Sequence, residues 1–118
     1  MRLSEFQTWV SKRWRSNPRE QDLAIMTLGL CGEAGEVSEP IKKQIRGSKP
    51  VDVYALSLEL GDVVHYACAI ADYFGINMED VLTNNVAKIE ARAAAGDVQG
   101  RRDPGMNAHD NLYPKEGA

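Results

Sequence analysis

Apolar side chains recur every three or four residues along most of the chain, which is the spacing of one face of an α-helix. The first group is Phe6, Trp9, Val10 and Trp14. It predicts a helix over residues 4–15 that starts with Ser4 as its N-cap. Asn17 and Pro18 then interrupt the pattern. They suit the N-cap and the first position of a second helix, in which Glu20 completes a capping box.

The second predicted helix, over residues 18–46, carries a long apolar face. This face is formed by Leu23, Met26, Leu30, Ala34, Val37 and Ile41. The sequence is otherwise unfavourable for a helix, because its glycines each cost about 1 kcal/mol relative to Ala and Pro40 removes a backbone hydrogen bond. The glycines are Gly29, Gly32 and Gly35. Close packing of another helix or close approach of a ligand would explain them. Gly47 and Pro50 end the element.

Two more helices are predicted, over residues 52–74 and 78–95. The apolar face of the third is Leu56, Leu60, Val63, Ala67, Ile70 and Phe74. The apolar face of the fourth is Val81, Leu82, Val86 and Ile89. Gly75 is a natural stop for the third helix, Asn77 suits the N-cap of the fourth, and Gly96 ends it. Because no segment reads as a strand, we predict an all-α fold of four main helices.

The composition changes after residue 96, where Gly, Pro, Asp and Asn become frequent and apolar residues are scattered. We therefore expect a single all-α domain over residues 1–96, since 118 residues suit one domain. Residues 97–118 form a predicted irregular tail without a core of its own, either disordered or lying over a partner subunit.

The charge balance and the hydropathy pattern limit the classes of ligand and the cellular compartment that we expect. A net charge of −3 argues against binding a nucleic acid polymer through a basic surface, although a metal ion can still supply local positive charge for a nucleotide. No apolar run approaches the roughly 20 residues of a membrane span, and the N-terminus lacks the apolar core of a signal peptide. We expect a cytoplasmic protein with no membrane partner. Cys31 and Cys68 read as two reduced, buried thiols.

Two acidic pairs are the main candidates for chemistry. Glu33 and Glu36 lie in the second predicted helix, and Glu59 and Asp62 lie in the third. A spacing of three residues keeps each pair within about one helical turn, and both pairs border the apolar faces, so they would meet across a helix interface. Four converging carboxylates repel each other without a cation. Oxygen ligands without histidine or thiolate favour Mg²⁺, with Mn²⁺ as a substitute. The alternative is two solvated acidic edges, with Glu39 exposed nearby.

A polar stripe on the fourth predicted helix is the second candidate. Asn85, Lys88 and Arg92 share one side of this helix, next to its apolar face. An amide, an ammonium and a guanidinium suit the sugar hydroxyls and phosphate oxygens of a nucleotide. The alternative is a solvated polar face with Glu90 as a local partner.

The aromatic residues and the histidine of the domain have simpler interpretations. We expect Phe6, Trp9 and Trp14 to pack into the core, with one Trp ring stacking on a base as the alternative. His65 follows Asp62 by one turn, and we expect a half-buried, hydrogen-bonded imidazole there.

Three segments together resemble a known family. They are LGLCGEAGEV at 28–37, ELGDV at 59–63 and NVAKI at 85–89. Their order E-x-x-E, E-x-x-D and N-x-x-K resembles the MazG-like nucleotide pyrophosphohydrolases of the all-α NTP pyrophosphatase superfamily, which also includes the dimeric dUTPases. The resemblance covers about residues 20–92. Many members continue with Tyr-Pro after the final basic residue, whereas Ala93 follows here, so the tail gains no site from the resemblance.

The resemblance implies a Mg²⁺-dependent hydrolase that cuts a nucleoside triphosphate between the α and β phosphates into a monophosphate and pyrophosphate. It implies that Glu33, Glu36, Glu59 and Asp62 hold the metal. It also implies that Asn85 and Lys88 face the nucleotide and that Arg92 matches a basic position of the family. The family works as dimers or tetramers, so we expect a homodimer or homotetramer.

The residues agree with this chemistry. A carboxylate is needed to orient or deprotonate the attacking water, and we favour Glu36, with Glu33 as the alternative. Lys88 would stabilise phosphate charge. The base preference stays open, since its contacts would come from the first helix, the loop over residues 47–54 or a neighbouring chain.

Two other functions compete with the hydrolase. A di-iron or di-manganese carboxylate bundle needs Glu-x-x-His on two helices, and only Asp62 with His65 comes near that motif. A non-catalytic helical module that binds nucleotides or a partner does not need four converging acids. Pyrophosphate release separates the hydrolase from both.

Overall fold

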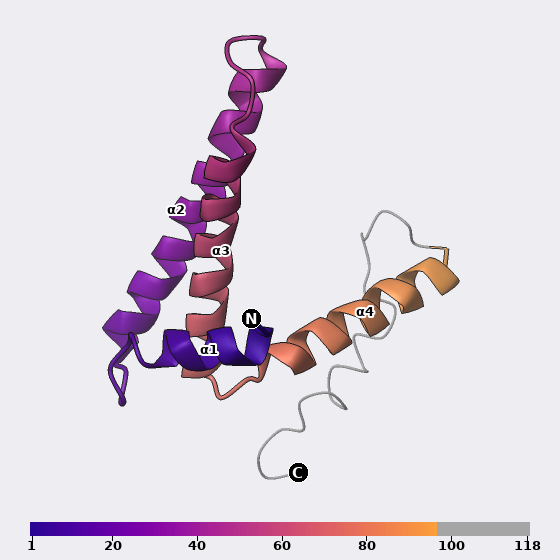
Figure 1. The fold of residues 1–118 in the computed structure, drawn as a ribbon. Coiled ribbons are helices and arrows are strands. Elements are labelled where there is room, and N and C mark those ends of the chain that lie inside the picture. Colours follow the sequence, from indigo (N-terminus) through magenta and orange to yellow (C-terminus); the bar gives the residue numbers. More distant parts are fainter. Residues whose placement is uncertain (97–118) are drawn as a thin grey trace. The chain divides into compact units, whose positions relative to one another are not determined.

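The computed structural model describes residues 1–96 and contains four α-helices (Figure 1). The helices are α1 (Leu3–Ser11), α2 (Glu20–Ile45), α3 (Val53–Tyr73) and α4 (Met78–Ala94). Within these described residues there is no strand, so the predicted all-α class is confirmed. The tail predicted for 97–118 lies outside the described residues.

The starts of α1 and α2 differ from the predicted ones. Arg2 rather than Ser4 precedes α1, and its backbone N–H donates to Glu5 Oε2 at 2.8 Å. Arg19, rather than Asn17, precedes α2, and its backbone N–H donates to Asp22 Oδ2 at 2.7 Å. In both cases an acid three residues into the helix accepts the N-cap N–H, so the helix starts without a Ser or Asn cap. The helix predicted to reach residue 15 ends at Ser11.

The other helix ends follow the turn chemistry that the sequence indicates. Asp52 caps α3 by accepting the backbone N–H of Ala55 at 3.0 Å. Gly47, Gly75 and Gly96 follow α2, α3 and α4 with φ values of 76°, 67° and 78°. These left-handed conformations favour glycine, which explains why the three helices stop there.

The segment Met1–Met78 forms one unit, in which α2 and α3 run side by side in opposite directions and α1 packs against α3 (Figure 1). The fully or nearly fully buried apolar residues are Val10, Met26, Cys68, Ala69, Ala71 and Met78. Gly29 of α2 lies against the ring of Tyr66 on α3, and a Cβ at Gly29 would collide with that ring. Close helix packing therefore explains this glycine, whereas a Cβ at Gly32 or Gly35 would meet no atom within 4 Å.

Two polar side chains hold α1 and its neighbouring loops in place. The Gln7 amide nitrogen donates to the Ile76 carbonyl at 2.8 Å, and its oxygen accepts the Met78 N–H at 2.9 Å. Asp22 is buried and lies 3.3 Å from Nε of Arg15. These contacts tie the middle of α1 to the segment that follows α3, and the α1–α2 loop to the start of α2.

Several residues predicted for the core are exposed in the single chain. They are Ala34 and Ile41 on α2, Leu60 on α3, Phe74 after it, and Leu82, Val86 and Ile89 on α4. The prediction assumed that the whole apolar face of each helix is buried. In the single chain, the other helices bury only part of each face. Cys31 is also exposed, contrary to prediction, whereas Cys68 is buried as predicted, and burial and the nearby Asp72 raise its thiol pKa.

Helix α3 is long and apolar enough to pass a length-and-composition test for a membrane span, with a mean hydropathy of 1.2. The expectation that no segment approaches such a length was therefore wrong for Val53–Tyr73. The same helix packs against α1 and α2 and carries the acidic residues Glu59 and Asp62, and 11% of its apolar window is buried in the single chain.

Candidate active site

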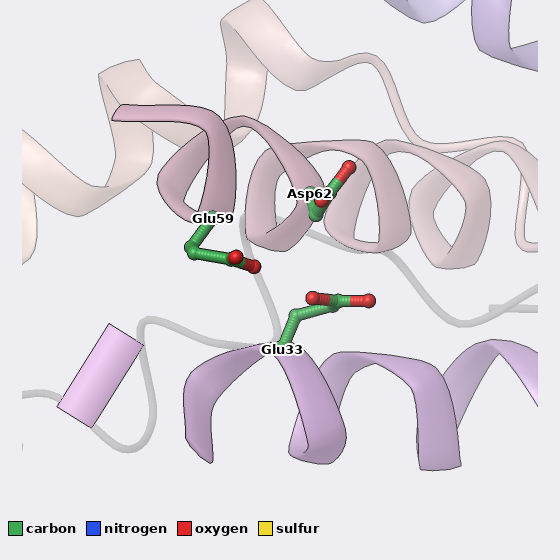
Figure 2. A group of neighbouring side chains, drawn as sticks. All are labelled: Glu33, Glu59 and Asp62. Carbon is green, nitrogen blue, oxygen red and sulfur yellow. The ribbon is translucent and has the colours of Figure 1, made fainter. Parts of the chain in front are cut away.

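Three carboxylates converge between α2 and α3. Glu33 extends from α2 toward α3, which carries Glu59 and Asp62 (Figure 2). One oxygen from each residue lies within 4.8 Å of the other two. The structure thus brings together three of the four predicted metal ligands, which we call the carboxylate cluster.

The antiparallel register of α2 and α3 produces this meeting. Gly29 faces Tyr66, Glu33 faces Asp62, and at the far end Gln44 Oε1 accepts the Val51 N–H at 2.8 Å. The residue numbers of these pairs add to the same total, as they must for two helices that run in opposite directions with equal rise. The tight Gly29–Tyr66 contact lies one turn from the cluster on both helices, so it sets their approach there.

The electrostatics of the cluster are those of a site that attracts cations. Glu33 and Glu59 are half-buried and Asp62 is exposed. Desolvation raises the pKa of Glu33, and the charges of Asp62, Glu59 and Glu36 raise it further, as does a side-chain hydrogen bond with Glu59. A cation between these groups would relieve the repulsion and favour the ionised form of Glu33.

Glu36, the fourth predicted ligand, is exposed and lies outside the three converging residues. It contributes to the raised pKa of Glu33, so it belongs to the same electrostatic neighbourhood. Glu39 is different, because its carboxylate pairs with Lys42 at 2.8 Å and this hydrogen bond lowers its pKa. Glu39 is therefore already neutralised, as expected for a surface acid.

A cleft of about 290 Å³ opens directly beside the cluster, between the C-terminal half of α2 and the N-terminal half of α3. Its lining includes Glu36, Pro40, Lys43, Lys49, Leu56 and Glu59. The two lysines were missed at the sequence level. The available signal was the spacing of Glu36 and Lys43, which are two helical turns apart and so share a face of α2.

The nucleotide-facing residues predicted on α4 remain a prediction. Asn85 and Lys88 are exposed, and Arg92 is half-buried. They lie in the second unit of the chain, which begins at Glu79.

The aromatic residues near the cluster pack on one another. His65 is half-buried, as predicted, and lies edge-on to the rings of Phe6 and Trp9, with centroid distances of 6.4 and 6.2 Å. Trp9 is 42% exposed, but Phe6 stacks on it at 5.9 Å and the Arg13 guanidinium lies 4.1 Å from its ring centroid. The prediction that Trp9 packs into the core was therefore wrong, and the stacking of a base on its partly open ring stays a prediction.

Comparison with known proteins agrees with the geometry. The profile of the MazG nucleotide pyrophosphohydrolase domain matches residues 21–95, a segment that contains the whole carboxylate cluster. The chain belongs to the MazG family. It is also 33% identical over 87 residues to the Gene 37 protein of Mycobacterium phage L5, across 70% of this chain and 76% of that protein. No solved structure is significantly similar to the chain.

The donor set fits the divalent metals that MazG-type hydrolases use. It consists of carboxylate oxygens alone, and neither histidine nor cysteine joins the cluster among the described residues. Such ligands favour hard cations of the Mg²⁺ and Mn²⁺ type over zinc or iron.

Proposed function

We propose that this MazG-family protein is a Mg²⁺-dependent nucleoside triphosphate pyrophosphohydrolase. The observation that carries the proposal is the carboxylate cluster, formed across α2 and α3 inside the segment that matches the family. The substrate is a (d)NTP, and the products are the (d)NMP and pyrophosphate. The role is control or cleaning of the nucleotide pool in the cytoplasm, with no nucleic acid polymer or membrane as a partner.

Glu33, Glu59 and Asp62 would hold the metal, and Glu36 would be a fourth ligand or the base. When bound, Mg²⁺ supplies positive charge that offsets the phosphate charge and the charge growing on the leaving group. Mn²⁺ is expected to substitute because it accepts the same oxygen ligands.

The reaction needs one water and releases one proton. The water oxygen forms a bond to the α-phosphorus, and the bond from this phosphorus to the α–β bridging oxygen breaks. Its electron pair leaves with pyrophosphate. Glu36 accepts the proton from the water, because it is exposed, borders the cleft and stands apart from the three converging carboxylates. Glu33 is the alternative base.

On α4, Asn85 would bind sugar hydroxyls, and Lys88 and Arg92 would bind phosphate oxygens. An amide and two permanent cations on one helix stripe have the donors that this task requires. Both Asn85 and Lys88 are exposed, which leaves them accessible to a ligand.

We further propose that the active protein is a homodimer or homotetramer. Large apolar side chains are exposed along all the long helices of the single chain, and they would be covered by further copies of it. They include Ile25, Leu28, Leu58, Leu82, Val86 and Ile89. This extent of apolar exposure exceeds the scattered residues normal for a monomer surface.

The experiment that tests the proposal is a panel of standard and modified (d)NTPs incubated with Mg²⁺, with products separated by chromatography. Formation of monophosphate and pyrophosphate from at least one nucleotide, abolished by EDTA, is the expected result. Release of orthophosphate would indicate cleavage at another bond. Nucleotide binding without any product would instead favour a non-catalytic nucleotide-binding module.

A further inference from the structure

The cleft beside the carboxylate cluster has opposite charges at its two ends. By their order along α2 and α3, Glu36 and Glu59 lie nearer the cluster, and Lys43 and Lys49 lie nearer the α2–α3 loop. The lining also contains Glu39, which pairs with Lys42, and Asp52, which caps α3. Lys43 follows Glu36 by seven residues on α2, so the two ends are about 10 Å apart along the helix. This length is comparable to that of an extended triphosphate.

The loop end of the cleft is held in place by the local fold. The Gln44 side chain accepts the Val51 N–H at 2.8 Å, which fixes the α2–α3 loop on α2. Asp52 caps α3 by binding the Ala55 N–H. Pro40, inside α2, and Pro50, in the loop, form stiff walls at this end.

Neither lysine forms an ion pair in the part of the chain that the structure describes, although the Lys43 charge helps to lower the pKa of Glu39, which also lines the cleft. The ion pairs there join Arg15 and Arg19 to Asp22, and Lys42 to Glu39. Thus no carboxylate of residues 1–96 lies within 4.0 Å of the Lys43 or Lys49 ammonium. The Asp52 carboxylate, at the same end, is engaged by a backbone N–H. Two ammonium groups that open onto one cleft suit an anion with several oxygens.

We propose that this lysine end is the subsite for the β- and γ-phosphates of the substrate, an inference that rests on the proposed pyrophosphohydrolase function. The scissile α–β bond lies at the acidic end, and the terminal phosphates extend toward Lys43 and Lys49. When the bond breaks, negative charge grows on the leaving pyrophosphate, and the two ammonium groups stabilise it there. The nucleoside lies on the opposite side of the cluster from the lysines.

The test compares Lys43→Met, Lys49→Met and the double variant with Lys12→Met, a matched control that removes the same charge from an exposed lysine at the end of α1. The first measurement is calorimetric binding of inorganic pyrophosphate in the presence of Mg²⁺. The second is the ratio of kcat/KM for a nucleoside triphosphate to that for the diphosphate of the same base. Helix content by circular dichroism verifies folding, and Lys43→Arg tests rescue by a second cation.

The double variant is expected to bind pyrophosphate at least about tenfold more weakly, and its preference for triphosphate over diphosphate is expected to fall by a similar factor. Lys12→Met and Lys43→Arg are expected to stay within about twofold of the wild type. Unchanged pyrophosphate binding in the double variant overturns the inference, as does a loss that varies with the base of the substrate.

The two proposals fail in different ways. If turnover does not depend on the lysines, the proposed phosphate subsite is refuted and the proposed hydrolase function is retained. If pyrophosphate binding depends on the lysines but no nucleotide is turned over, the hydrolase function is refuted and the anion-binding subsite is retained.

Discussion

Glu33 on α2 and Glu59 on α3 bring their carboxyl groups together across the interface of the two helices, with one oxygen of each within 4.8 Å of the other (Figure 2). Two carboxylates so close cannot both ionise without strong repulsion. A cation bound between the two groups would relieve this repulsion, and the repulsion raises the pKa of Glu33 when no cation is there. This repulsion links the stability of the domain to pH and to divalent metal.

Replacing Glu33 with Gln is expected to stabilise the metal-free protein at neutral pH. The pKa of Glu33 is raised above its ordinary value of 4.5, so the folded state disfavours the ionised form. The Glu33 carboxyl therefore contributes fully to the free energy of unfolding below pH 4.5, and this contribution is lost as the pH rises through the pKa of the folded state. Melting curves in EDTA should therefore place Glu33→Gln above the wild type at pH 7, with the gap closing toward about pH 4.

Mg²⁺ is expected to reverse this order, because it binds the folded wild type and raises its melting temperature more than that of Glu33→Gln. Glu90→Gln, which removes an exposed carboxylate from α4, serves as the control and should follow the wild type. A Glu33→Gln protein that melts below the wild type in EDTA at pH 7 would contradict the electrostatic description of the cluster.

Replacing Gly29 with Ala is expected to destabilise the domain by about 1–3 kcal/mol, because the added methyl group collides with the Tyr66 ring. Gly32→Ala is the matched comparison on the same helix, where a Cβ meets no atom of the chain within 4 Å. Its effect on the monomer should be a gain of up to about 1 kcal/mol from helix propensity. Urea unfolding of the two variants measures both effects, and equal stability of the two would argue against the close α2–α3 contact.

Replacing Asp22 with Asn is expected to lower the free energy of unfolding by about 1–3 kcal/mol. The buried carboxylate accepts the Arg19 N–H and lies beside the Arg15 guanidinium, and an amide cannot serve both partners as well. Because Asp22 lies away from the carboxylate cluster, metal binding below the melting temperature should be retained. A stability equal to that of the wild type in urea unfolding would show that this anchor is dispensable.

Replacing Leu28 with Lys is expected to shift the protein from its oligomer toward the monomer. Leu28 is 73% exposed in the single chain, so the substitution should change monomer stability by no more than about 0.5 kcal/mol. Light scattering coupled to size exclusion measures the mass, with Ser16→Lys in the α1–α2 loop as the control. A wild type that is monomeric at high concentration would refute the proposed oligomer.

The helices and their ends were predictable wherever one residue type determines the conformation. Gly47, Gly75 and Gly96 each adopt a positive φ that other residues avoid. Asp52, which was predicted as the first residue of the third helix, is its N-cap, a role that an aspartate favours. The starts of α1 and α2 were not predictable in the same way. There the acceptors are Glu5 and Asp22, so the first helical turn determines the start rather than the residue before it.

The carboxylate cluster was predictable in composition but not in arrangement. Helical spacing alone placed Glu33 and Glu36 together on α2, yet the packing of the two antiparallel helices decides which of them joins Glu59 and Asp62. Glu33 joins them, whereas Glu36 lines the neighbouring cleft. The exposed apolar residues of α4 show a second limit, since periodicity identifies the apolar face of a helix but does not say what, if anything, packs against it.

The most direct test of the central claim is pyrophosphate release from the best (d)NTP substrate, measured with and without Mg²⁺ for the wild type and Glu59→Gln. The wild type should release pyrophosphate only with Mg²⁺. Glu59→Gln should keep its helix content and lose at least about hundredfold in turnover, since even the partners of metal ligands are worth roughly 10–100-fold. Full turnover of the folded Glu59→Gln protein with unchanged metal dependence would contradict a catalytic site at this cluster.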